Sequence, residues 1–141
     1  MSQLFFEDVA IGDEITPLVV TCDETQLFLF SAATYNAHRI HYDKTWARDE
    51  GYTDVLVQGP LQAGLLSRAV TDWIGPRGRL VSFSTQNRAV AHPGEELTFT
   101  GTVTATNELS GRIDLDLVGR RGDTVLMPGT AAVRLPKRSA G

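Results

Sequence analysis

The feature that most constrains the fold is one long apolar helix followed by stretches of alternating residues. From Pro60 onward, apolar residues recur at helical spacing: Leu61, Leu65, Leu66, Ala69, Val70 and Trp73. This spacing places them in one broad stripe along a helix. Pro60 suits the first helical position because a proline has no N–H to leave unpaired there. Gly75 and Pro76 end the pattern, so the sequence predicts a buried helix of about four turns.

After Gly78 the hydrophobic period changes to two. Strands are predicted over residues 79–87, 95–107, 110–119 and 124–135, and Gly, Pro, Asn and Asp fill the connections between them. One long helix followed by an antiparallel meander predicts an α+β domain, with the helix packed across the concave face of the sheet. A curved antiparallel sheet wrapped round a long central helix is the hotdog plan. Periodicity alone leaves other α+β arrangements open.

The first half of the chain is richer in helices and loops. A turn at residues 12–13 leads into a short strand over 14–21, and Thr21 or Asp23 can cap a helix that runs to about Ala33. Its expected inner face consists of Leu27, Phe28, Phe30 and Ser31. A polar, irregular segment over 34–43 precedes a short helix that begins near Asp43 or Lys44 and stops at Gly51. No linker divides the chain, so residues 1–141 are expected to form a single domain, with a flexible tail from about residue 136.

Charge and composition exclude several classes of partner. The net charge of −4 gives no basic surface for nucleic acid, and no apolar run is long enough to cross a membrane. The first residues lack the layout of a secretory signal. A lone cysteine, Cys22, allows neither an internal disulfide nor a cysteine-rich metal site. These features predict a cytoplasmic protein.

Three histidines are the candidates for acid–base chemistry. His92 stands before Pro93-Gly94 and is interpreted as a loop residue, whereas His38 and His41 share the polar segment between the two short helices. No further His or Cys stands at ligand spacing, so no metal site is predicted. Imidazole titrates near neutrality and suits general acid–base catalysis. From the residues alone, His41 is equally well interpreted as a surface or capping histidine.

The polar segment resembles the hydratase motif of the MaoC-like dehydratases. That motif runs Asp-x-Asn-Pro-x-His-x-Asp after a Ser/Thr-Gly pair, and here residues 36–43 follow Phe30-Ser31-Ala32. The resemblance covers most of the chain. Within the family, the segment is most similar to that of the mesaconyl- and itaconyl-CoA hydratases. It includes Phe6-Glu7-Asp8-Val9, Gly12-Asp13, Gly59 at the start of the long helix, and Pro93-Gly94-Glu95 before a strand.

This resemblance implies (R)-specific addition of water across the 2,3 double bond of an enoyl thioester, or the reverse dehydration. His41 falls on the family's catalytic histidine, and Asn36 falls on its catalytic aspartate. An amide cannot exchange a proton as a carboxylate does. The hypothesis is therefore that His41 transfers the protons and Asn36 orients the water.

The remaining candidates bind the substrate. The N–H of Gly59 or Leu61 is expected to stabilise charge on the thioester oxygen at the positive end of the helix. Further candidate substrate-binding residues are Gln58, Gln62 and Tyr35. A solvated position is an equal alternative for Gln62. No cofactor is expected beyond the coenzyme A or acyl-carrier thioester of the substrate itself.

Two alternatives remain. A hotdog thioesterase needs a carboxylate near the thioester carbonyl, but the long helix carries only Asp72, close to its far end. A weakly active or non-catalytic subunit is the other alternative, because Asn36 replaces the family aspartate and residues 70–76 resemble steroid side-chain hydratases. A homodimer or a dimer of dimers is expected, with a second hotdog subunit as the other form of assembly.

Overall fold

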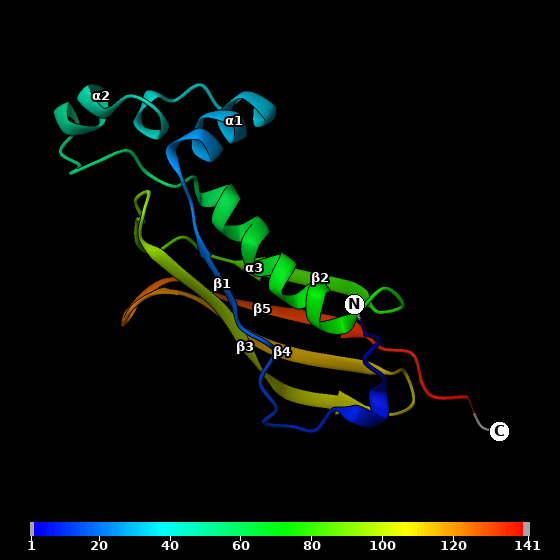
Figure 1. Cartoon of the computed structure of the whole chain (residues 1–141). Coiled ribbons are helices and arrows are strands. Elements are labelled where there is room, and N and C mark those ends of the chain that lie inside the picture. The colour runs from blue at the N-terminus through cyan, green and yellow to red at the C-terminus, as the bar shows by residue number, and fades with distance from the viewer. Residues whose placement is uncertain (1, 140–141) are drawn as a thin grey trace.

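The computed structural model describes residues 2–139 and shows one long helix cradled by a curled sheet (Figure 1). Helix α3 (Gly59–Ile74) packs on an antiparallel sheet of five strands. In spatial order these are β1 (Leu18–Thr21), β3 (Glu96–Asn107), β4 (Arg112–Arg121), β5 (Thr124–Arg134) and β2 (Arg79–Thr85). The α+β hotdog arrangement predicted from the sequence is confirmed.

The core lies between the inner face of the sheet and the apolar stripe of α3. The stripe buries Leu61, Leu65, Leu66, Ala69, Val70 and Ile74. Alternate residues of β3 and β4 face it, with Phe99 and Leu115 almost fully buried. Burial raises the pKa of the Cys22 thiol and the nearby Asp23 charge raises it further, so Cys22 packs as a small neutral side chain.

Two short helices stand beyond the N-terminal end of α3, away from the strands (Figure 1). They are α1 (Glu24–Thr34) and α2 (Lys44–Asp49), with the one-turn helix η2 (Arg39–His41) between them. Asp23 caps α1 through Gln26 N, and Asp43 caps α2 through Trp46 N. Both helices therefore begin within the predicted positions, and Gly51 has the positive φ expected after α2.

The structure corrects several details of the prediction. The first strand begins at Leu18 rather than Glu14, because Pro17 has no N–H to continue the ladder and Glu14 makes only an isolated bridge to Thr102. The prediction that Phe28 lies on the inner face of α1 is wrong. Phe28 is 56% exposed, because Leu27 and Ser31 occupy the buried side of the helix. The strand predicted over 79–87 is β2, which ends at Thr85. The strand predicted over 110–119 is β4, which runs over Arg112–Arg121.

Both ends of the described chain meet at a one-turn helix, η1 (Phe6–Asp8). Phe6 N donates to Pro136 O at 3.0 Å, and Arg138 forms an ion pair with Asp8 at 2.7 Å. Residues 136–138 are therefore attached to η1 although they form neither helix nor strand. No helix among the described residues is long and apolar enough to span a membrane.

Candidate active site

The segment that leads into α3 is held from both sides. Leu56 N donates to Ile40 O at 2.9 Å, whereas Val57 N donates to Ala91 O at 2.8 Å. Side-chain contacts follow the same alternation, because Val55 O pairs with a ring nitrogen of His92 and Leu56 O with one of His41. Successive backbone groups of a strand-like segment point to opposite sides. Each histidine is thus fixed to a different flank of the chain just before α3.

His41 is the buried member of the polar segment. Its side chain lies at the end of η2, the residue is 9% exposed, and Nδ1 is 2.9 Å from Leu56 O. A carbonyl oxygen only accepts, so the neutral ring must carry its proton on Nδ1 and leave Nε2 as the acceptor. The carbonyl of Leu56, three residues before the first residue of α3, therefore selects the tautomer of the His41 ring.

His38 is bound differently. It is exposed, and its own Nδ1 accepts from Ile40 N at 3.3 Å, which caps η2. Its ring meets the His41 ring edge-on, with the ring centroids 6.2 Å apart. His38 is therefore a capping residue beside the buried imidazole. His92 is also structural: it lies in the loop before β3, with Nδ1 2.9 Å from Val55 O.

Asn36 and Tyr35 lie at the C-terminal end of α1. Tyr35 ends the helix with φ +56° and is 95% exposed, while Asn36 N donates to Ser31 O at 2.9 Å. Asn36 Oδ1 accepts weakly from His38 N, at 3.4 Å. Both residues line a small cavity of about 200 Å³, together with Phe28, Ser31, Ala32, Ala37 and Tyr42. The structure thus joins Asn36 and Tyr35 in one cavity, and among the described residues it shows no hydrogen bond between Asn36 and His41.

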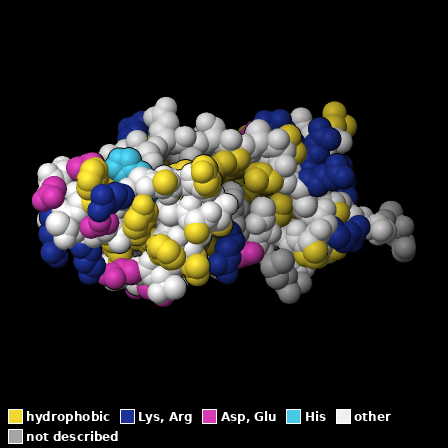
Figure 2. Space-filling model, turned by 90° about the horizontal axis from the view of Figure 1, so that it is seen from above, with side chains coloured by type: hydrophobic (Ala, Val, Ile, Leu, Met, Phe, Trp, Pro, Cys, Tyr) yellow, Lys and Arg dark blue, Asp and Glu magenta, His cyan; other side chains and the backbone are white. Residues whose placement is uncertain are grey.

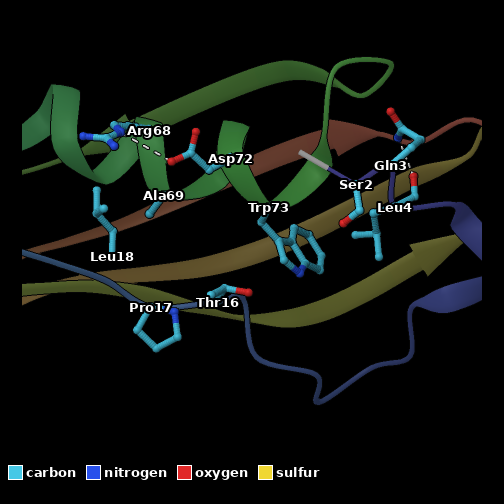
Figure 3. A pocket seen from close by; sticks show the side chains of 10 residues that line it. All are labelled: Ser2, Gln3, Leu4, Thr16, Pro17, Leu18, Arg68, Ala69, Asp72 and Trp73. Carbon is cyan, nitrogen blue, oxygen red and sulfur yellow. Dashed lines mark hydrogen bonds and ion pairs between the residues drawn. The ribbon is translucent and has the colours of Figure 1, made fainter.

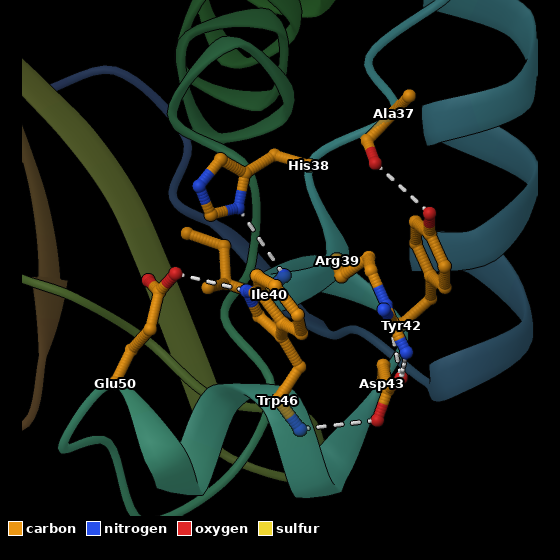
Figure 4. Close-up of polar contacts among 8 residues, drawn as sticks. All are labelled: Ala37, His38, Arg39, Ile40, Tyr42, Asp43, Trp46 and Glu50. Carbon is orange, nitrogen blue, oxygen red and sulfur yellow. Dashed lines mark hydrogen bonds and ion pairs between the residues drawn. The ribbon is translucent and has the colours of Figure 1, made fainter.

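A polar network fixes the loop that carries His41 (Figure 4). Tyr42 Oη donates to Ala37 O at 2.9 Å, and the Arg39 guanidinium forms an ion pair with Asp43 at 2.6 Å while stacking over the Trp46 ring. Hydrogen bonding from Trp46 N and the neighbouring Arg39 hold the pKa of the Asp43 carboxyl below its ordinary value of 3.8. Asp43 therefore caps α2 and anchors Arg39.

The lowered pKa of Asp43 predicts a pH-dependent contribution to stability. A carboxyl whose folded pKa is depressed stabilises the fold above its unfolded pKa, near 3.8, and loses that contribution as the pH falls through the folded value. Asp43→Asn keeps a capping oxygen but removes the charge. We expect wild type to exceed Asp43→Asn in urea midpoint at pH 7, with the difference shrinking below pH 4. A difference that persists undiminished at low pH would contradict this assignment.

The start of α3 supplies free donors. Gly59 and Leu61 belong to the first turn of the helix, where backbone N–H groups have no helical acceptor. Within residues 2–139 neither N–H has another acceptor, whereas Gln62 N already donates to Gln58 O. The Leu61 side chain is buried. The two predicted oxyanion donors are thus both unpaired at the positive end of the helix.

Gln58 and Gln62 lie one turn apart at this helix start, and both are buried. Gln58 Nε2 donates to Leu27 O at 2.6 Å and to Ser31 Oγ at 2.9 Å, so the side chain ties α1 to the start of α3. Gln62 is 1% exposed, so the solvated alternative is wrong. Within the described chain, Oε1 of each glutamine has no hydrogen-bond donor. The sequence did not indicate this structural role of Gln58, because its partners lie about 30 residues away.

A cavity of about 660 Å³ opens near the other end of α3 (Figure 3). Its walls are the N-terminal segment, the residues around the start of β1, and Arg68 to Trp73 of the helix. None of the predicted catalytic or substrate-binding residues lines it. Asp72, the acid considered for a thioesterase, lies on its rim in an ion pair with Arg68 at 3.4 Å. The candidate site is therefore assigned to the buried His41 ring and the free N–H groups at the start of α3, and not to this large cavity.

A curled sheet round one helix, with a buried histidine bonded to the segment that leads into that helix, fits a hotdog dehydratase of the MaoC-like class. The family model for hydroxyacyl-thioester dehydratase type 2 matches residues 11–92, more than half of the chain. The chain belongs to this family. Residues 2–139 hold no cluster of three or more His, Cys, Asp or Glu side chains arranged as metal ligands.

Relatives of known activity support the same class. The chain is 32% identical to the 3-oxo-4,17-pregnadiene-20-carboxyl-CoA hydratase beta subunit of Mycobacterium tuberculosis, over 92% of this chain and 98% of that protein. It is 54% identical over 57 residues to the mesaconyl-C(4)-CoA hydratase of Chloroflexus aurantiacus, a match that covers 40% of this chain and 20% of that protein.

Solved structures agree on the fold. The ChsH1-ChsH2 complex from M. tuberculosis contains a chain that is 28% identical, with a TM-score of 0.81 over 89% of this chain and 98% of that one. The R-hydratase PhaJ1 from Pseudomonas aeruginosa is 17% identical, with a TM-score of 0.88 over 96% of this chain and 88% of that one. At that identity the second similarity concerns the fold alone.

Proposed function

We propose that this protein adds water to the 2,3 double bond of an enoyl thioester with (R) specificity, or removes it from the 3-hydroxyacyl thioester. The observation that carries the proposal is the buried His41 ring, whose Nδ1 is bonded to Leu56 O. This bond leaves Nε2 as a base beside the start of α3. Membership of a family of thioester dehydratases supplies the reaction class.

The proposed hydration needs one base and one oxyanion site. His41 Nε2 takes a proton from water while the water oxygen bonds to C3. The C2–C3 π electrons then form an enolate whose charge rests on the thioester oxygen. The unpaired N–H groups of Gly59 and Leu61 stabilise that charge. The protonated His41 returns a proton to C2, which restores the imidazole and yields the 3-hydroxyacyl thioester.

Amide groups complete the site in this proposal. Asn36 orients the attacking water, because an amide can accept a hydrogen bond from it without exchanging a proton. Gln62 has a buried Oε1 without a donor, which suits the second hydrogen of the water or the 3-hydroxyl of the product. Gln58 holds α1 against α3. Tyr35, which is almost wholly exposed, lines the cavity of Asn36 and contacts the outer part of the substrate.

The proposed reaction uses no cofactor beyond the thioester carrier, which is coenzyme A or an acyl-carrier protein. We also propose that the active form is an oligomer of hotdog chains, a homodimer or dimer of dimers. Hydrophobic side chains remain exposed over α1 and α2 (Figure 2), including Phe28, Leu29, Tyr35, Tyr42 and Trp46. Strand β2 is also an edge with an exposed Val81. Such surfaces are suited to pairing.

The test is an ultraviolet assay of the purified chain against a panel of enoyl-CoA thioesters of different chain length and branching. We expect loss of the enoyl absorbance and formation of the 3-hydroxyacyl thioester of (R) configuration. Release of free thiol without loss of the double bond would indicate a thioesterase instead. No change with any thioester, alone or with a second hotdog chain, would refute both hydratase proposals.

A second candidate is a subunit that works only with a different hotdog chain. The match to nearly the full length of a hydratase beta subunit favours it, as does Asn36 at the position of the family's aspartate. In that case the purified chain is expected to be inactive alone and to gain hydratase activity when a second hotdog chain is added. Size-exclusion chromatography of the mixture measures the association directly.

A further inference from the structure

Asn87 lies directly against the first residue of α3. A Cβ built on Gly59 would be 1.9 Å from Asn87 Nδ2 and 3.0 Å from Asn87 Cγ, but 3.4 Å from Oδ1. The amide nitrogen is therefore the part of the side chain that lies nearest to the Cβ position of Gly59. No side chain larger than hydrogen fits at Gly59 unless the amide moves, so the glycine and the asparagine form one close-packed pair.

The backbone holds Asn87 in this position. Residues 86–88 continue beyond β2, and Gln86 N and Arg88 N donate to Pro128 O and Leu126 O of β5, at 3.3 and 2.8 Å. Farther along, Ala91 O accepts from Val57 N. The segment after β2 thus runs beside the segment that leads into α3, and hydrogen bonds on both sides of Asn87 fix where its side chain starts.

The Asn87 amide has hydrogens to donate. Among the described residues, Asn87 Nδ2 donates no hydrogen bond, although its neighbours Thr85 and Arg88 each donate one from the side chain. The side chain is exposed, so a ligand can reach it. Beside it, the N–H groups of Gly59 and Leu61 are also free. Three unpaired donors around one helix start suit a carbonyl oxygen that gains negative charge.

We propose that Asn87 is a further catalytic residue, which donates a hydrogen bond from Nδ2 to the thioester oxygen alongside Gly59 N–H. This inference rests on the proposed function and adds to it a side-chain donor from the segment after β2. The bond strengthens as charge moves from the double bond to the oxygen, so it lowers the barrier to addition more than it tightens substrate binding.

The experiment compares Asn87→Leu and Asn87→Asp with wild type. Leucine keeps similar bulk without a donor, and aspartate places a negative charge beside the developing oxyanion. We expect kcat for enoyl-CoA hydration to fall about 100-fold in Asn87→Leu and further in Asn87→Asp, with KM little changed. Gln86→Leu, on the neighbouring exposed residue, is the matched control and is expected to keep wild-type kcat.

A measurement on a bound thioester that does not react tests the role of Asn87 independently of the proposed function. Saturated butyryl-CoA is bound to His41→Ala protein, and the infrared band of its thioester carbonyl is recorded with Asn87 and with Asn87→Leu. We expect the band to lie at lower frequency with Asn87 present, because a donor weakens the C=O bond. An identical band in both proteins, or an unchanged kcat in Asn87→Leu, overturns the role of Asn87 and leaves the hydratase proposal standing. An Asn87-dependent band in a protein that hydrates no enoyl thioester supports the donor and refutes the hydratase.

The pairing with Gly59 gives a second test. Gly59→Ala forces the Asn87 amide away, since the added carbon would lie 1.9 Å from Nδ2. We expect Gly59→Ala and Asn87→Leu each to lower kcat, and the double variant to be less impaired than the product of the two losses. Fully multiplicative losses would mean that the two residues act separately and would overturn the proposed pair.

Discussion

His41→Gln is expected to lower kcat for enoyl-thioester hydration by about 10²–10⁴-fold, the range of a general acid–base group. Glutamine can still donate a hydrogen bond toward Leu56 O, but it cannot take a proton from water at neutral pH. The variant should therefore remain folded while turnover is lost. Initial rates with the best thioester of the panel, together with thermal unfolding, measure the two effects separately.

His92→Gln is the matched control. His92 also places Nδ1 2.9 Å from a backbone carbonyl of the same segment, but on the opposite flank, at Val55. If activity requires a histidine only to hold this segment, both variants keep activity, because glutamine can still donate to the carbonyl. If the His41 imidazole transfers protons, only His41→Gln loses it. Wild-type rates in His41→Gln would refute the assignment of the base.

The sequence allowed the central elements of the fold to be predicted because their signals are local. The stripe from Leu61 to Val70 has helical spacing, Asp23 and Asp43 are good capping residues, and the residues of β3 alternate. Errors arose where a long-range contact overrides a local pattern. Phe28 fits an apolar helix face, but Gln58 fixes α1 through Leu27 O and Ser31 Oγ, and in that orientation Phe28 stays exposed.

The candidate site could be predicted only in part. The motif indicated His41 and Asn36, and Pro60 indicated the helix start at which Gly59 and Leu61 lie. Which ring nitrogen of His41 is free to accept a proton depends on Leu56 O, fifteen residues away, and no local pattern shows that bond. Asn87 could not be found from the sequence, because it reaches Gly59 from the end of another element, 28 residues further along the chain.

Gln58 and Gln62 are one turn apart, equally buried and of the same residue type, yet opposite effects are expected from changing each to leucine. Gln58→Leu removes the donor to Leu27 O and Ser31 Oγ, so it should lower the free energy of unfolding by about 1–3 kcal/mol. Gln62→Leu removes a buried oxygen that has no donor within residues 2–139, so stability should be unchanged or higher.

Activity is expected to show the reverse order of effects. A leucine at position 62 cannot accept a hydrogen bond from the water or the 3-hydroxyl, so Gln62→Leu should lower kcat/KM about tenfold, the worth of one such bond. Urea unfolding and hydration rates, measured on both variants, check the pair of expectations. A Gln62→Leu protein that gains stability and keeps full activity would show that Gln62 takes no part in the reaction. Equal destabilisation by both changes would mean that Gln62, like Gln58, has a partner that holds the helices together.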